Sequence, residues 1–238
     1  VRISWDEALN ILASEIKRVK DTYGNESIMV TGGDITRALT LYGGYTTTWG
    51  TTSWGTWFYT GPKTGLGDGL YATSHNDRMD LRNSQLVVMW GANPAWSSQG
   101  NPTYFYQAAK AAGAKFIFID PFYNDSAMIL ADEWIPIRPA TDHALALGIA
   151  HTLITEDNPK TNPLIDWDFL NRCTVGFDKD HMPTGVDAKE NFRDYVLGTQ
   201  DGQAKTAEWA AEICGVHPDR IRALARDIGG QMREEARQ

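Results

Sequence analysis

Residues 115–121, K-F-I-F-I-D-P, are the stretch that decides the fold we expect for this chain. The run Lys115–Ile119 is apolar after its first residue, as is typical of a strand buried on both faces of a parallel sheet. Asp120 and Pro121 follow at once and mark a turn. The stretch therefore predicts a central parallel strand that runs directly into a polar loop.

Two further apolar runs lie on either side of this stretch, over residues 85–90 and 133–137. The pattern between the runs predicts a helix over 103–112, closed by Gly113, and a short helix over 125–130. Strands and helices that alternate with these lengths indicate right-handed βαβ units and a parallel sheet. We therefore predict an α/β fold, with a Rossmann-like parallel sheet flanked by helices.

The chain opens with a helix signal, because Ser4 begins a capping box, S-W-D-E. Apolar residues then recur at helical spacing as far as Tyr23, and Gly24 ends the pattern. A short apolar strand is expected over 27–31, and a glycine turn then leads into a short helix. Further helices are expected over 141–155, capped by Thr141, over 167–171, over 206–214 and from Pro218 onward.

The stretch over residues 42–55, Y-G-G-Y-T-T-T-W-G-T-T-S-W-G, has four glycines, five threonines, a serine, two tryptophans and no charged side chain. Glycine allows the backbone to approach a ligand closely, and tryptophan offers a flat apolar wall. We interpret the stretch as a loop wrapped around a large ligand, with one hydroxyl available for chemistry. A threonine-rich β-hairpin with its turn at Gly43 and Gly44 is the alternative.

Polar residues follow each of the three predicted strands, and ligands of open parallel sheets bind beyond such carboxyl ends. Backbone N–H groups in these turns can hold phosphate oxygens. Asp120 is placed to accept from ribose hydroxyls, and Asp142 can accept two N–H groups from a guanine edge. The candidate residues are Gly91, Asn93 and Pro94 after the first run, Asp120 and Pro121 after the second, and Ala140, Thr141 and Asp142 after the third.

Each strand end also has a purely structural interpretation. Asn93 can belong to a simple turn, Asp120 can cap the following segment, and Asp142 can balance a helix dipole. Three such ends together favour a nucleotide site. No strand is followed by G-x-G-x-x-G, and G-x-x-x-x-G-K-[ST] is absent, which disfavours ordinary NAD and P-loop binding.

Composition excludes several classes of protein. The 238 residues carry a net charge of −8, which disfavours a nucleic-acid partner because phosphate binding needs clustered lysine and arginine. No run of about 18 apolar residues occurs, so we expect no direct membrane insertion. Cys173 and Cys214 lack metal-ligand spacing, and the five histidines form no ligand motif, so no metal–thiolate site is expected within this chain.

Several motifs taken together resemble a known family. They are the capping-box helix, the Y-G-G loop ending in serine, L-V-V-M-W-G-A-N-P, F-I-F-I-D-P and E-W-I-P-I-R-P-A-T-D-H-A-L. In this order they resemble the molybdopterin oxidoreductases of the dimethyl sulfoxide reductase family, from Ile3 to about Ile228. The resemblance implies part of a larger multi-domain molybdoenzyme. Residues 1–60 would carry the metal-ligand loop, and residues 61–238 a Rossmann-like domain that binds molybdopterin guanine dinucleotide.

The resemblance implies a molybdenum ion held by two molybdopterin guanine dinucleotides. It makes Ser53 the catalytic residue and the metal ligand, bound as an alkoxide. The strand-end residues named above would contact one dinucleotide. The loop residues implied in cofactor binding are Trp49, Gly50, Thr51, Thr52 and Ser53.

The implied activity is reduction of an S-oxide or N-oxide by oxygen-atom transfer. The resemblance also implies a [4Fe-4S] cluster in a part of the parent before Val1, an iron–sulfur electron-transfer subunit, a membrane anchor subunit and an exported, periplasmic location. The 238 residues alone are expected to be inactive. The family's D-P-R is here Asp120-Pro121-Phe122, which removes a cation near the cofactor. A non-catalytic, nucleotide-binding α/β scaffold module is the alternative.

Overall fold

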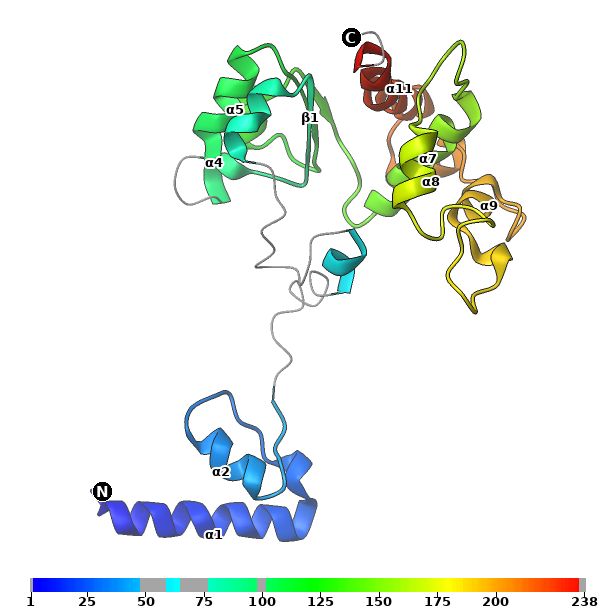
Figure 1. Cartoon of the computed structure of the whole chain (residues 1–238). Coiled ribbons are helices and arrows are strands. Elements are labelled where there is room, and N and C mark those ends of the chain that lie inside the picture. Colours follow the sequence, from blue (N-terminus) through cyan, green and yellow to red (C-terminus); the bar gives the residue numbers. More distant parts are fainter. Residues whose placement is uncertain (1, 48–58, 65–76, 98–101, 236–238) are drawn as a thin grey trace. The chain divides into compact units, whose positions relative to one another are not determined.

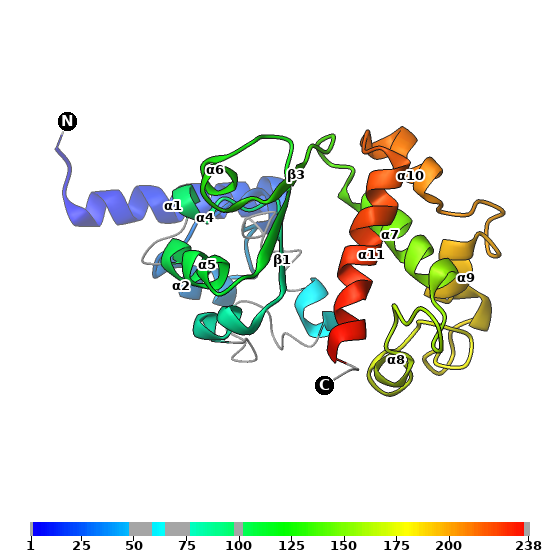
Figure 2. The ribbon, with the colours of Figure 1, turned by 90° about the horizontal axis from the view of Figure 1, so that it is seen from above.

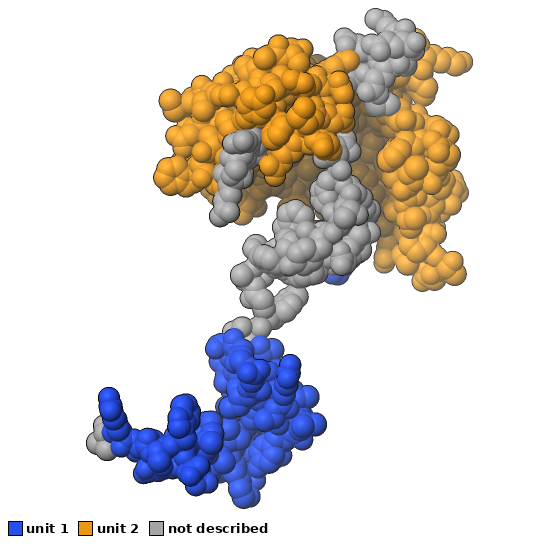
Figure 3. Space-filling view, turned by 60° about the vertical axis from the view of Figure 1, so that its left-hand side comes forward, with its two compact units in different colours: residues 1–75 blue, residues 76–238 orange. Residues whose placement is uncertain are grey.

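The computed structural model describes residues 2–47, 59–64, 77–97 and 102–235. The chain divides into two compact units, residues 1–75 and 76–238, which Figure 3 colours separately. The domain boundary that we expect after residue 60 stays a prediction, because residues 48–58 and 65–76 lie outside the described part.

The first unit begins with α1 (Trp5–Tyr23), as the capping box predicts (Figure 1). The Ser4 hydroxyl accepts a hydrogen bond from the Glu7 backbone N–H at 3.2 Å. Gly24 ends the helix with a φ of 86°, which an L side chain rarely adopts. Other helices in the described part of this unit include the 3₁₀ helix η1 (Asn25–Ser27), α2 (Ile35–Leu41) and the 3₁₀ helix η2 (Gly61–Thr64).

The prediction of a short strand over residues 27–31 is wrong. Within the part of the chain that the structure describes, this segment forms only an isolated parallel bridge, between Met29 and Thr46. Thr46 donates its N–H to the Ile28 carbonyl at 2.8 Å and accepts from the Val30 N–H at 3.0 Å. The pairing stops there because the chain turns at Gly32, where φ is 129°.

The second unit contains a parallel three-stranded sheet with the order β1 (Leu86–Trp90), β2 (Lys115–Ile119), β3 (Glu133–Ile135). This arrangement confirms the predicted fold class. The third strand ends two residues earlier than expected. Pro136 follows it, and a proline has no N–H with which to continue the ladder.

Helices cover both faces of this sheet, and Figure 2 shows the strands between them. On one face lie α5 (Pro102–Ala111) and α6 (Asp125–Leu130). On the other lie α7 (Asp142–Glu156), α10 (Ala207–Cys214) and α11 (Pro218–Glu235). The remaining helices among the described residues of this unit are the 3₁₀ helix η3 (Arg78–Asn83), α4 (Pro94–Ser97), α8 (Trp167–Cys173), the 3₁₀ helix η4 (Ala188–Glu190) and α9 (Phe192–Leu197).

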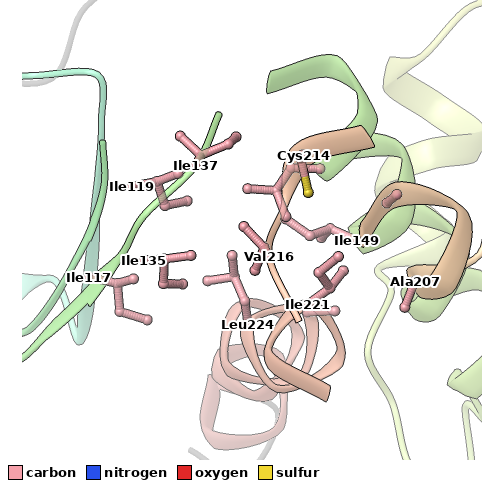
Figure 4. Packing of buried hydrophobic residues seen from close by; sticks show 13 residues of the cluster. Ile117, Ile119, Ile135, Ile137, Ile149, Ala207, Cys214, Val216, Ile221 and Leu224 are labelled. Atoms are coloured by element: carbon pink, nitrogen blue, oxygen red, sulfur yellow. The ribbon is translucent and has the colours of Figure 1, made fainter. Parts of the chain in front are cut away.

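The central strand β2 contributes side chains to the core on both faces of the sheet, because successive side chains of a strand point to opposite faces. Phe116 and Phe118 pack with residues of α5 and α6. Ile117 and Ile119 pack with residues of α7, α10 and α11, and Figure 4 shows Ile117 pointing toward Leu224 of α11. All four strand side chains are fully buried, so each stabilises the fold by about 1.5–3 kcal/mol.

Candidate functional site

The three strands end level with one another. Trp90 pairs with Ile119, and Ile119 pairs with Ile135. The Gly91 N–H donates to the Ile119 carbonyl at 2.9 Å, and the Asp120 N–H donates to the Ile135 carbonyl at 3.3 Å. The residues that follow β1 and β2 therefore start from one edge of the sheet.

The loop after β1 has an open backbone and an oriented amide. Gly91 has a φ of 59°, and a Cβ at this position would meet no atom within 4 Å. Asn93 accepts through Oδ1 from the hydroxyl of Ser126 at 2.8 Å and from its backbone N–H at 3.2 Å. Asn93 Nδ2 donates to no atom of the described residues. Pro94 is buried and begins α4.

The loop after β2 is held by Asp120. Asp120 Oδ1 accepts from the Phe122 N–H at 2.8 Å, so the aspartate does cap the segment that follows Pro121. Asp120 Oδ2 accepts from Asn124 Nδ2 at 3.1 Å, and the same nitrogen lies 3.3 Å from the Ala92 carbonyl. Asn124 thereby ties the two loops together. Each carboxylate oxygen keeps a lone pair for a further donor.

The segment after β3 reaches the same edge through Asp142, the first residue of α7. Asp142 Oδ1 accepts from the indole N–H of Trp90 at 2.7 Å. Asp142 Oδ2 makes no hydrogen bond within the described part of the chain. Ala140 adopts a φ of 63°, a strained value for a residue other than glycine, and strained backbone clusters at functional sites.

Thr141 is the N-cap residue of α7, as expected, but its side chain makes no capping hydrogen bond. The Thr141 hydroxyl turns back and donates to the Arg138 carbonyl at 2.7 Å. Arg138 in turn donates to the Glu212 carbonyl at 2.7 Å, at the carboxyl end of α10, where a cation is favourable.

The candidate metal-ligand loop lies outside the described residues. Trp49, Gly50, Thr51, Thr52 and Ser53 all fall in this gap, so their roles stay predictions. The start of the loop is described. Helix α2 extends to Leu41 and Asn25 Nδ2 donates to the Gly44 carbonyl at 2.7 Å, so a hairpin that turns at Gly43 and Gly44 is excluded.

Sequence reasoning missed three residues that build the strand-end site: Trp90, Asn124 and Ser126. Asn124 carried a usable signal, because an asparagine just before a predicted helix is a typical N-cap, and its Oδ1 accepts from the Ala127 N–H at 3.0 Å. Trp90 carried none. Its partner Asp142 is 52 positions away, and no local pattern joins them.

Two apolar hollows lie away from the strand ends. One, of about 260 Å³, is lined by residues of α7, α8, α9 and the loops that follow α7 and α8, including Leu153, Leu164 and Phe169. Another, of about 390 Å³, lies between α1 and α2 in the first unit. Neither contains a strand-end residue.

Among the described residues, no three His, Cys, Asp or Glu side chains are grouped to hold a metal ion, and no helix has the length and apolar character to cross a membrane.

Comparison with known proteins gives the chain's family. A family model described as molybdopterin oxidoreductase matches residues 1–175, which is well over half of the chain. The chain belongs to the molybdopterin oxidoreductase family. The match includes β1, β2, β3 and all of the strand-end residues described above.

Several curated relatives are similar over almost the whole chain. A putative dimethyl sulfoxide reductase chain, YnfE, of Escherichia coli K12 is 40% identical, over 96% of this chain. Dimethyl sulfoxide reductase DmsA of the same organism is 38% identical, and a trimethylamine-N-oxide reductase of Haemophilus influenzae is 34% identical. The chain spans only 28–29% of the length of these three molybdopterin oxidoreductase relatives.

A solved structure supports the fold. Acetylene hydratase from Pelobacter acetylenicus superposes with a TM-score of 0.51 over 95% of this chain and 28% of that protein. The sequence identity is 23%, so this likeness concerns the fold alone.

Proposed function

We propose that this chain binds a molybdopterin guanine dinucleotide at the carboxyl edge of its sheet, as part of a molybdenum oxidoreductase. The observation that carries the proposal is a set of fixed polar groups with uncommitted atoms at that edge, in a member of the molybdopterin oxidoreductase family. When bound, a pair of such dinucleotides and their molybdenum supply the oxygen-atom transfer and the two-electron redox chemistry.

The chemistry of the edge fits a guanine dinucleotide. Asp142 offers an uncommitted acceptor, Oδ2, and the guanine base presents N–H donors. Asn93 offers an uncommitted donor, Nδ2, which suits phosphate or ribose oxygens. The backbone at Gly91 is open to close approach. Each of these groups thus has a counterpart on the ligand.

The described residues have distinct roles in this proposal. Asp120 accepts from ribose hydroxyls through its remaining lone pairs, while Phe122 and Asn124 keep its carboxylate in place. Asp142 accepts from the base. The full set of proposed contacts is Gly91, Asn93, Pro94, Asp120, Pro121, Ala140, Thr141 and Asp142.

We assign the metal-ligand role to Ser53 within the loop 49–53. An alkoxide is a hard ligand and suits a high-valent oxo metal, and no cysteine lies near Ser53 in the sequence to compete for it. Thr51 and Thr52 are also hydroxyl residues, and only the family motif distinguishes Ser53 from them. Trp49 and Gly50 complete the proposed surroundings of the metal.

The names of the relatives suggest the reaction. Dimethyl sulfoxide and trimethylamine N-oxide both carry a terminal oxide, and we propose an S-oxide or N-oxide as the substrate. The resemblance further suggests a [4Fe-4S] cluster in the parent outside these 238 residues, an iron–sulfur electron-transfer subunit, a membrane anchor subunit and an exported, periplasmic location. These partners are part of the proposal.

The reaction is tested with the purified enzyme that contains this chain, a reduced viologen dye as electron donor, and either dimethyl sulfoxide or trimethylamine N-oxide. We expect dimethyl sulfide or trimethylamine to form, with two electrons consumed per product molecule. An enzyme that contains no molybdenum and turns over neither oxide would contradict the proposal and favour a non-catalytic scaffold.

A further inference from the structure

One hydrogen bond joins the end of β1 to the start of α7. The indole N–H of Trp90 donates to Asp142 Oδ1 at 2.7 Å, and both side chains are half-buried. An indole nitrogen is a donor only, so it can hold an acceptor atom and nothing else. Trp90 therefore determines which atom of residue 142 faces the protein.

A second bond of the same kind, at the other end of α7, provides a comparison. The indole N–H of Trp167 donates to Asp157 Oδ2 at 2.7 Å. Asp157 Oδ1 also accepts from the backbone N–H groups of Leu164 at 2.7 Å and Ile165 at 3.0 Å. Both oxygens of that carboxylate are committed to the fold. Asp142 differs, because the described chain uses only one of its oxygens.

We propose that Trp90 is a positioning residue for base recognition. It holds Asp142 Oδ1, so that Oδ2 is presented to the 2-amino group of guanine, while the second lone pair of Oδ1 accepts from the ring N–H. The inference rests on the proposed function, and it adds a residue that does not itself contact the base. Without the indole N–H, the carboxylate rotates among its side-chain rotamers and loses this preset orientation.

Replacement of Asp142 by asparagine makes the inference specific. An amide has one oxygen and one NH₂, and the indole N–H of Trp90 can donate only to the oxygen. The NH₂ then takes the place of Oδ2. There it opposes the 2-amino group of guanine donor to donor, but it can donate to the 2-carbonyl of xanthine. The donor and acceptor pattern of the amide therefore favours xanthine over guanine, and Trp90 presets the one amide orientation that xanthine can use.

The experiment titrates the full chain with guanosine, inosine and xanthosine 5′-monophosphates by calorimetry. The wild type is expected to bind the guanosine nucleotide more tightly than inosine monophosphate, which lacks the 2-amino group. Trp90→Phe is expected to weaken guanosine monophosphate binding about tenfold and to reduce that preference. The matched control Trp167→Phe removes the equivalent indole–carboxylate bond and is expected to leave the preference unchanged.

Asp142→Asn is expected to prefer xanthosine monophosphate to guanosine monophosphate. The double variant with Trp90→Phe is expected to bind xanthosine monophosphate more weakly than Asp142→Asn alone, because the orientation of the amide is no longer preset. Trp90→Leu removes the same indole N–H with a different side chain, so the inference is tested even where Trp90→Phe fails to fold. A guanine preference that survives in Trp90→Phe would overturn the inference alone. An Asp142→Asn chain that still prefers guanosine monophosphate would overturn the inference together with the proposed contact between Asp142 and the base. A wild-type chain that binds no guanosine monophosphate would overturn the inference and the nucleotide part of the proposed function together.

Discussion

Ser126 carries two hydrogen bonds on a hydroxyl that is completely buried. It donates to Asn93 Oδ1 at 2.8 Å and accepts from the Ala95 N–H at 2.9 Å. Ser126→Ala removes both bonds at once, each worth about 0.5–1.5 kcal/mol, so we expect a loss of about 1–3 kcal/mol in the free energy of unfolding. Urea unfolding of the chain measures this loss.

The control for Ser126 is Ser97→Ala. Ser97 is exposed, and its hydroxyl donates to the Asn93 carbonyl at 2.9 Å. Water replaces that bond, so the free energy of unfolding should change by no more than about 0.5 kcal/mol. Equal losses from the two variants would show that burial of the Ser126 hydroxyl is irrelevant to the strand-end loops.

Ser53 is the residue on which the proposed metal chemistry depends. In the enzyme that contains this chain, Ser53→Ala is expected to keep the fold and most of the pterin but to lose nearly all oxide reduction. Ser53→Cys keeps a ligand, but a softer one that donates more electron density, so the metal's reduction potential and absorption spectrum should shift. Thr51→Ala and Thr52→Ala are the controls, and they should neither abolish oxide reduction nor shift the metal's reduction potential and spectrum. Full turnover by Ser53→Ala, with an unaltered molybdenum spectrum, would refute the ligand assignment.

The sequence predicted the position of the strand-end acids but not their partners. Asp120 and Asp142 follow apolar runs that form strands, so their place at one sheet edge follows from topology. The bonds that orient them come from Asn124 and Trp90. The Trp90 bond depends on the geometry between a strand and a helix far apart in the sequence, which periodicity does not encode.

Helix α7 packs against α10 and α11 at Gly148, where there is no room for a side chain. A Cβ there would lie 2.8 Å from the Cβ of Ala210 and 3.2 Å from Cγ2 of Ile221. Gly148→Ala is therefore expected to destabilise the chain by about 1–3 kcal/mol, less the gain of about 0.5–1 kcal/mol from better helix propensity.

Gly230→Ala in α11 is the matched control, because a Cβ there meets nothing within 4 Å. It should gain the helix-propensity term without the clash and so stabilise the chain by about 0.5–1 kcal/mol. Thermal or urea unfolding compares the two variants. A stabilising Gly148→Ala would mean that α7 and α10 pack less closely than described.

The ion pair between Glu156 of α7 and Arg226 of α11 predicts a pH dependence. Two guanidinium nitrogens of Arg226 lie 2.7 and 2.8 Å from the carboxylate oxygens, and this hydrogen bonding lowers the pKa of Glu156 below its ordinary 4.5. A carboxyl whose folded pKa is depressed stabilises the fold above the unfolded pKa. That contribution is lost as the pH falls through the folded pKa.

The Glu156→Gln variant should therefore have a lower free energy of unfolding than the wild type at neutral pH. In acid the difference between the two should become smaller. Arg226→Gln removes the other partner of the ion pair and should show the same pH-dependent loss in the free energy of unfolding. Urea unfolding from pH 7 down to about pH 3 measures both. A difference between wild type and Glu156→Gln that stays constant over this range would contradict the pKa shift.

The sequence predicted elements correctly where several local signals agree, although it missed the end that Pro136 sets for β3. Lys115–Ile119 and Asp125–Leu130 form with the predicted bounds, and Ser4 caps α1. The strand expected over 27–31 failed because its apolar residues find only a single bridge partner in Thr46. A run of apolar residues shows that burial is favourable, but it does not specify a neighbouring strand.

At the scale of the whole chain, the second unit has its own core on both faces of the sheet. We therefore expect the purified chain to fold without cofactor and to unfold cooperatively. We also expect it to hold no molybdenum tightly, since it spans only 28–29% of its relatives and the proposed cofactor is a large ligand. Stoichiometric molybdenum and pterin in the purified 238-residue chain would contradict this expectation.

The most direct test of the account is the guanine nucleotide content of the purified enzyme that contains this chain. Acid hydrolysis should release two guanosine monophosphates per molybdenum from the wild type. Asp142→Ala should lose nucleotide and molybdenum while the protein stays folded, and Asp125→Ala, an exposed acid in the first turn of α6, should retain both. Absence of guanine from the wild type, or an Asp142→Ala enzyme with full nucleotide content, would contradict the assignment of the strand-end edge as the dinucleotide site.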